Sequence, residues 1–120
     1  MKIAFTTSGD SLSAPLDSRF GRAPKFILYD LAAGTFEVID NKQNLNAAQG
    51  AGIQSAQTVA QLGAEAVVTG HCGPKAFLTL QTVGVKVFIG AAGTVAEAVA
   101  AYKASTLKAA AAADVEGHWA

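Results

Sequence analysis

The segment Gly70-His71-Cys72-Gly73-Pro74-Lys75 holds the residues of this chain with the clearest chemical potential. It joins an apolar run typical of a buried strand to a helix that starts with proline, so the single cysteine and one of the two histidines lie at a helix N-terminus. Backbone N–H groups and the positive end of the helix dipole favour an anion there, and glycines let it approach the backbone closely. The segment therefore predicts a site for a negatively charged ligand.

A second stretch has the same layout without the reactive pair. Gly84 to Val99 repeats the order glycine, apolar strand, Gly-x-x-Gly and helix, with Gly90-Ala91-Ala92-Gly93 at the turn. We interpret the glycine spacing as serving the fold, because a short strand-to-helix turn needs permissive backbone at both ends. His71 and Cys72 are then the residues that the fold alone does not explain.

The composition limits the class of protein. The 120 residues fit one domain, and nine basic against nine acidic side chains create no general field for nucleic acid, so any anion site must be local. The single cysteine excludes an internal disulfide, and the N-terminal residues lack the pattern of a signal peptide. We therefore expect a cytoplasmic protein. Since no apolar run reaches about 18 residues, we also expect no membrane span.

The apolar pattern predicts an α/β domain. Strands are expected at 2–6, 26–30, 36–40, 66–69 and 85–89, and helices between 50 and 63, at 74–82 and from 94 onward. The second and third strands suit an antiparallel hairpin, whereas the later strands alternate with helices, which favours parallel neighbours. We therefore expect a mixed sheet of about five strands with helices on its faces, and ligands beyond the carboxyl ends of the strands.

The connecting segments differ in composition. Residues 8–24 are rich in Ser, Gly, Pro and charge, which predicts a long surface loop, and residues 41–49 form a polar connector. Ala109 to Ala113 is prone to helix, so we expect it to extend the third helix before the chain frays towards Ala120. The expected organisation is one domain over 1–108, followed by an Ala-rich helical extension and flexible tail over 109–120.

Three segments carry a family resemblance. Phe20-Gly21-Arg22-Ala23 is followed by Gly50-Ala51-Gly52 and then by Gly70 to Ala76, in the order and approximate spacing of the dinitrogenase iron-molybdenum cofactor-binding family. The resemblance covers roughly residues 1–105 and implies a ribonuclease H-like α/β fold. It also implies a role in binding, carrying or assembling an anionic metal-sulfur cluster. Among stand-alone members, the chain is most similar to those that hold a molybdenum-copper sulfide cluster without a covalent anchor.

The residues of these segments suit such a cluster, which needs permissive backbone, hydrogen-bond donors, cations and apolar walls. Arg19 and Arg22 offer planar guanidinium groups on either side of Gly21, and Lys75 adds a positive charge. Because the cluster brings its own sulfides, the protein need not coordinate the metal directly. The candidate site is Arg19, Phe20, Gly21, Arg22, Gly50, Ala51, Gly52, Gly70, His71, Cys72, Gly73, Pro74, Lys75 and Phe77.

Structural roles compete with the functional ones for several of these residues. Cys72 can be a small buried thiol, and His71 can bond to loop backbone. Phe20 and Phe77 suit a core as well as a pocket wall. If a thiolate is needed, the helix N-terminus lowers the pKa of a cysteine, and copper(I) prefers soft sulfur, so a copper contact from Cys72 or His71 stays a hypothesis.

Three other classes of function compete with a cluster carrier: a nuclease, a protein that binds a phosphorylated metabolite, and a non-catalytic regulator or chaperone that docks on a partner protein through an exposed apolar patch. Nuclease chemistry requires several carboxylates around divalent ions, and the first strand has none. A small enzyme or sensor for a phosphorylated metabolite would use the same helix N-termini, although Gly50-Ala51-Gly52-Ile53 lacks the other residues of a phosphate-binding loop. We therefore predict a cluster-binding protein that is not an enzyme, with a protein partner in delivery or regulation, and keep the phosphorylated metabolite as the alternative.

Overall fold

The computed structural model describes residues 1–41 and 50–110. Over these residues, six strands form one sheet in the order β3-β2-β1-β4-β5-β6. β1 pairs antiparallel with β2 and parallel with β4, and β4 pairs parallel with β5. The predicted mixed sheet is therefore confirmed, with one strand more than expected. The strands are β1 Lys2–Thr7, β2 Lys25–Asp30, β3 Thr35–Asp40, β4 Ala66–Val68, β5 Lys86–Ile89 and β6 Lys108–Ala109.

The β2-β3 hairpin confirms the turn predicted between these strands. Asp30 pairs with Thr35, and Gly34 adopts a positive φ of 70° that glycine tolerates best. The backbone N–H of Ala33, aided by that of Ala32, donates to the Asp30 carboxylate and lowers its pKa. These bonds fix the register of the hairpin at its closed end.

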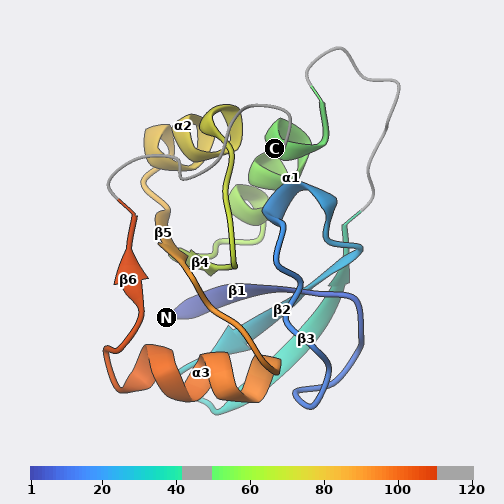
Figure 1. The fold of residues 1–120 in the computed structure, drawn as a ribbon, viewed down its shortest axis with the longest axis vertical. Coiled ribbons are helices and arrows are strands. Elements are labelled where there is room, and N and C mark those ends of the chain that lie inside the picture. The colour runs from blue at the N-terminus through green and yellow to red at the C-terminus, as the bar shows by residue number, and fades with distance from the viewer. Residues whose placement is uncertain (42–49, 111–120) are drawn as a thin grey trace.

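Three α-helices within the described residues cover both faces of the sheet: α1 Gly50–Gln61, α2 Pro74–Thr82 and α3 Val95–Lys103. Figure 1 shows α1 and α2 on one face and α3 on the other. Successive strand residues point to opposite faces, so Ala4 packs in the core beneath α1 and α2, whereas Phe5 packs beneath α3. This three-layer arrangement agrees with the predicted helices on both faces. None of the described helices has the length and apolar character to cross a membrane.

The segment after α3 corrects one prediction. The third helix ends at Lys103 and is not extended by the Ala-rich residues, because Ser105 takes a positive φ of 58° and the chain turns back as β6. The N–H of Ala110 donates to the Val87 carbonyl at 2.8 Å, so pairing with the exposed edge of β5 overrides local helix propensity. The rest of the predicted extension and tail, and residues 42–49 of the connector, lie outside the described residues.

The loop expected at residues 8–24 is packed back onto the domain. It contains a short 3₁₀ turn, η1 (Phe20–Arg22), and buries apolar side chains that include Leu16 and Phe20. Isolated bridges tie the loop to β1, to the start of α3 and to the segment before α2. The loop is therefore held in place from several sides, which matters because it carries both arginines of the chain.

Candidate anion-binding site

Two segments of the predicted site lie side by side. Arg19 and His71 form a parallel bridge just beyond the carboxyl ends of β1 and β4. The His71 N–H donates to the Ser18 carbonyl at 2.7 Å, and the Phe20 N–H donates to the His71 carbonyl at 3.1 Å. The fold thus brings the arginine loop, residues 8–24, to the His71 turn, residues 70–73, by backbone pairing. This contact lies at the sheet edge where ligands of α/β proteins usually bind.

Gly70 makes this pairing possible. A Cβ atom built on Gly70 would lie 2.7 Å from the Ser18 carbonyl oxygen and 2.9 Å from the Ser18 Cα, closer than real side chains approach backbone. Gly70 is not among the glycines with positive φ, whereas Gly90 and Gly93 are, at 80° and 82°. The two Gly-x-x-Gly turns therefore use their glycines for different reasons, which corrects the interpretation that both need permissive backbone.

The start of α3 is closed by the protein itself. Thr94 and Glu97 form a capping box, in which the Glu97 N–H donates to the Thr94 hydroxyl at 3.2 Å. The N–H groups of Val95 and Ala96 donate to loop carbonyls at 2.9 and 2.8 Å. No N–H donor of this first turn is left for an anion. The start of α3 therefore does not suit the alternative ligand, a phosphorylated metabolite.

The start of α2 is different. Its N-cap is Gly73, which gives no side-chain hydrogen bond, and Pro74 occupies the first helical position, where it has no N–H to satisfy. The first-turn N–H groups of α2 therefore have no capping side chain. Together with the neighbouring arginine loop, this helix start keeps the donors and the dipole that an anion needs.

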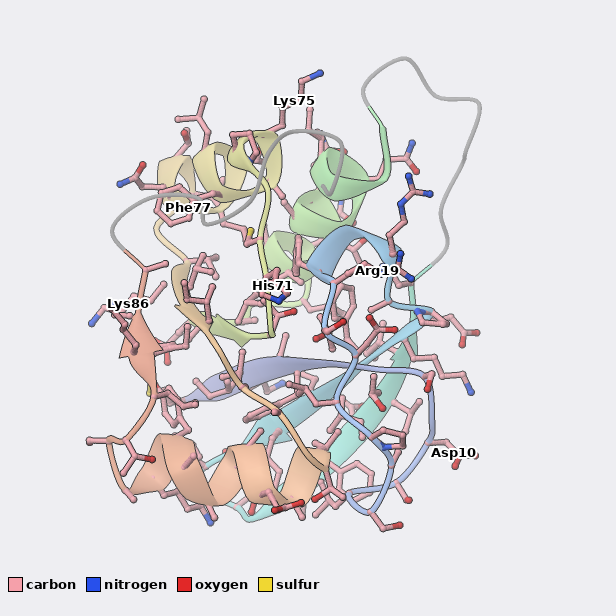
Figure 2. The ribbon with its side chains drawn as sticks, in the orientation of Figure 1. Asp10, Arg19, His71, Lys75, Phe77 and Lys86 are labelled. Carbon is pink, nitrogen blue, oxygen red and sulfur yellow. The ribbon has the colours of Figure 1, made fainter. Side chains whose placement is uncertain are left out.

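The charged side chains of the candidate site are exposed. Arg19, Arg22 and His71 reach solvent, and Figure 2 shows Arg19 and His71 on the same side of the molecule. Lys75 is also exposed but points outward from the start of α2, away from both. An anion beside Arg19 and His71 would thus lie apart from the Lys75 ammonium group.

Several other candidate residues, in η1 and at the start of α1, are buried. Phe20 is buried, with its ring centroid 5.8 Å from that of Phe26, so it is part of the core. Gly21 and Gly52 are buried too. α1, which begins with Gly50 and Ala51, packs against both η1 and α2. The helix that starts with the predicted glycine segment is therefore a neighbour of both η1 and α2.

Phe77 lies elsewhere. Together with Val87, Phe88 and Lys86 it lines a hollow of about 420 Å³ between α2, β5 and β6. Figure 2 shows Phe77 on the side of α2 remote from Arg19. The structure does not bring this residue to the arginine loop, and the hollow offers an apolar surface with one charged lysine.

Cys72 is buried, with 1% of its surface exposed, among core residues that include Ala76 and Leu80. Its Sγ lies 3.7 Å from the Gly73 carbonyl oxygen. This placement favours the structural role for the thiol. No group of three or more His, Cys, Asp or Glu side chains that could hold a metal ion occurs within residues 1–41 and 50–110.

We expect the Cys72→Ala variant to take up as much molybdenum and copper as the unmodified protein, because the thiol faces the core. Elemental analysis after anaerobic loading and desalting measures this. The His71→Ala variant serves as the comparison, since that side chain is exposed beside Arg19. Loss of copper by folded Cys72→Ala protein would show that the thiol ligates metal.

Sequence reasoning missed the buried polar residues of the described chain, and four of them surround the segment from Asp17 to Ala23 that carries both arginines: Thr6, Asn41, Ser55 and Thr69. Each bonds to another member of this set or to the loop backbone. For Thr6, Ser55 and Thr69 the sequence carries a signal, because each is polar at a position where the apolar pattern predicts core. Ser55, for example, follows Gly52 by three positions and precedes Val59 by four, so it lies on the buried stripe of α1. Asn41 carries no such signal, since it begins the segment predicted as a polar connector.

Fold and site together define a small mixed α/β protein with a cationic loop held at the carboxyl ends of its central parallel strands. A family model described as "Dinitrogenase iron-molybdenum cofactor" matches residues 1–105, and this chain belongs to that family.

The chain is also similar to three individual proteins. The apo form of the orange protein from Desulfovibrio gigas is 39% identical and matches with a TM-score of 0.90 over 95% of this chain and 96% of its own. A Thermotoga protein of the DUF35 family, solved by NMR, is 35% identical, with a TM-score of 0.77 over 90% and 91% of the two chains. An uncharacterized protein of Methanocaldococcus jannaschii is 32% identical over 91 residues, 73% of each chain. The family resemblance and the mixed α/β fold are confirmed, while the ribonuclease H-like label stays a prediction.

Proposed function

We propose that this chain binds, carries or helps assemble an anionic metal-sulfur cluster, held without a covalent bond against the paired arginine loop and His71 turn. The observation that carries the proposal is the backbone bridge between Arg19 and His71, which puts the exposed Arg19 guanidinium and the exposed His71 side chain beside an uncapped helix start. Family membership and the similarity to the orange protein support a metal cluster as the ligand.

A molybdenum-copper sulfide cluster is the cargo we propose. Such a cluster is anionic and presents soft sulfide surfaces, so guanidinium groups and backbone N–H donors can hold it from outside. The burial of Cys72 supports a non-covalent mode, because the single thiol of the chain faces the core. The role is that of a carrier or assembly protein rather than an enzyme, acting in the cytoplasm and handing its cluster to a protein partner.

Anaerobic incubation with tetrathiomolybdate and copper(I), followed by desalting, tests the proposal. We expect molybdenum and copper to co-elute with the protein and to give sulfide-to-metal charge-transfer absorption in the visible spectrum. A colourless, metal-free protein fraction would refute the cargo. The same incubation with inorganic phosphate in place of the metals tests the alternative, a site for a phosphorylated metabolite.

A further inference from the structure

The arginine loop carries its cationic side chains on a segment that is anchored at both ends by buried polar residues. At the first end, the Thr6 hydroxyl donates to the Asp17 carbonyl at 2.7 Å and lies 3.0 Å from the Thr69 hydroxyl. The Asp17 N–H donates back to the Thr6 carbonyl at 2.8 Å. Two hydrogen bonds therefore hold Asp17 against the end of β1. The next residue, Ser18, begins the pairing with His71.

The second anchor lies just after η1. The Asn41 side-chain amide donates to the Ala23 carbonyl at 2.8 Å and to the Ser55 hydroxyl at 2.9 Å. The Asn41 backbone N–H donates to the Pro24 carbonyl at 2.9 Å. This anchor ties the end of the loop to α1 and to the end of β3 at once.

These side chains need an explanation, since apolar residues would fill a core without requiring partners. Thr6, Thr69 and Ser55 are fully buried, and Asn41 is 5% exposed. A buried hydroxyl or amide destabilises a protein unless it is hydrogen-bonded, and here the bonds run to the loop carbonyls or to each other. Among the described residues, no buried side-chain nitrogen or oxygen lacks a partner.

We infer that Thr6, Thr69, Asn41 and Ser55 are positioning residues of the anion site, which fix the backbone between Asp17 and Ala23 so that Arg19 and Arg22 are presented in a ready-made arrangement. They do not touch the ligand. The inference rests on the proposed function, because it assigns these residues a role in retaining the same anion. A pre-ordered loop loses less conformational entropy on binding, so release of the anion is slower.

Thr7 provides a matched control. It follows Thr6 on β1, is equally buried, and its hydroxyl donates to the Pro15 carbonyl at 2.8 Å and accepts from the Gly9 N–H at 3.1 Å. Its bonds hold Gly9 and Pro15 and do not reach the segment from Asp17 to Ala23 that carries both arginines. Thr7→Val thus removes a buried hydroxyl of the same kind without releasing either anchor.

The test loads each protein with tetrathiomolybdate and copper(I) and measures how fast molybdenum is lost after desalting. We expect molybdenum to be lost about tenfold faster from Thr6→Val and from Ser55→Ala than from Thr7→Val. Residues that orient the groups contacting a metal, without contacting it themselves, have effects of this size. Thr6→Ser should restore slow loss, because it keeps the hydroxyl. Equal rates in Thr6→Val and Thr7→Val, at similar stability to urea, would overturn the inference.

Amide hydrogen exchange on the apo-protein separates this inference from the proposed function. The N–H groups of His71 and Phe20 bond across the loop contact, so their protection should fall in Thr6→Val and stay unchanged in Thr7→Val. If the unmodified chain retains no thiomolybdate, the proposed function fails, and exchange alone then decides the anchoring. Unchanged protection of the His71 and Phe20 N–H groups in Thr6→Val would overturn the inference that Thr6 anchors the loop.

Discussion

Replacing both arginines by alanine is expected to remove most of the cluster retention while leaving the domain folded. Arg19 and Arg22 are exposed, so their loss creates no cavity and exposes no core. A hydrogen bond to a charged group contributes about 1.5–3 kcal/mol, so two together correspond to roughly a hundredfold to ten-thousandfold in affinity, and screening by solvent at these exposed groups brings the expected loss towards the lower figure. Elemental analysis of molybdenum after desalting, at several protein concentrations, measures the loss.

A charge-matched control distinguishes a local site from general attraction. Lys86→Ala with Lys108→Ala removes two exposed positive charges from β5 and β6, and Lys86 also lines the apolar hollow beside Phe77. We expect this pair to retain the cluster. If the lysine pair loses the cluster and the arginine pair keeps it, the ligand lies in the hollow and the arginine loop is not the site. Added salt should weaken retention by the unmodified protein, because exposed charges are screened.

The Gly70→Ala variant is expected to separate the arginine loop from the His71 turn. Its Cβ would lie 2.7 Å from the Ser18 carbonyl oxygen, and backbone cannot give way as a flexible side chain can. Overpacking of this kind costs about 1–3 kcal/mol of the free energy of unfolding. Retention should fall as well, since the bonds between Ser18, His71 and Phe20 define the site.

Gly90→Ala is the natural comparison, because Gly90 holds the corresponding place in the related turn. Its φ is 80° and no atom lies within 4 Å of the added Cβ, so alanine there is strained without a clash. Left-handed backbone costs an ordinary residue about 1–2 kcal/mol, which makes the two variants similar in stability. Urea unfolding and cluster retention measured on both should show comparable stability but poorer retention in Gly70→Ala. Similar retention in the two would mean that the loop contact is dispensable.

The order of the elements was predictable because local patterns encode them. The alternation of apolar and polar residues and the glycine and proline positions located β1 to β5 and the starts of α1 to α3 within a few residues. The spacing of strands and helices also indicated the mixed sheet. β6 was not predictable from local pattern, because Lys108 and Ala109 form a strand only by pairing with the edge of β5.

By itself, the sequence determined the inventory of the candidate site and the segments that carry it. Glycine, arginine and a helix-starting proline identify these segments in the sequence without knowledge of their tertiary contacts, because the backbone freedom, charge and helix start that they provide are local properties. Only the tertiary structure decided that Arg19 pairs with His71, that Cys72 faces the core and that Phe77 lies beside a separate hollow. It also revealed why Gly70 must be glycine and why Thr6 and Asn41 are polar, because each contacts a carbonyl contributed by a segment distant along the chain. Such contacts depend on how the chain folds back on itself, which no local pattern records.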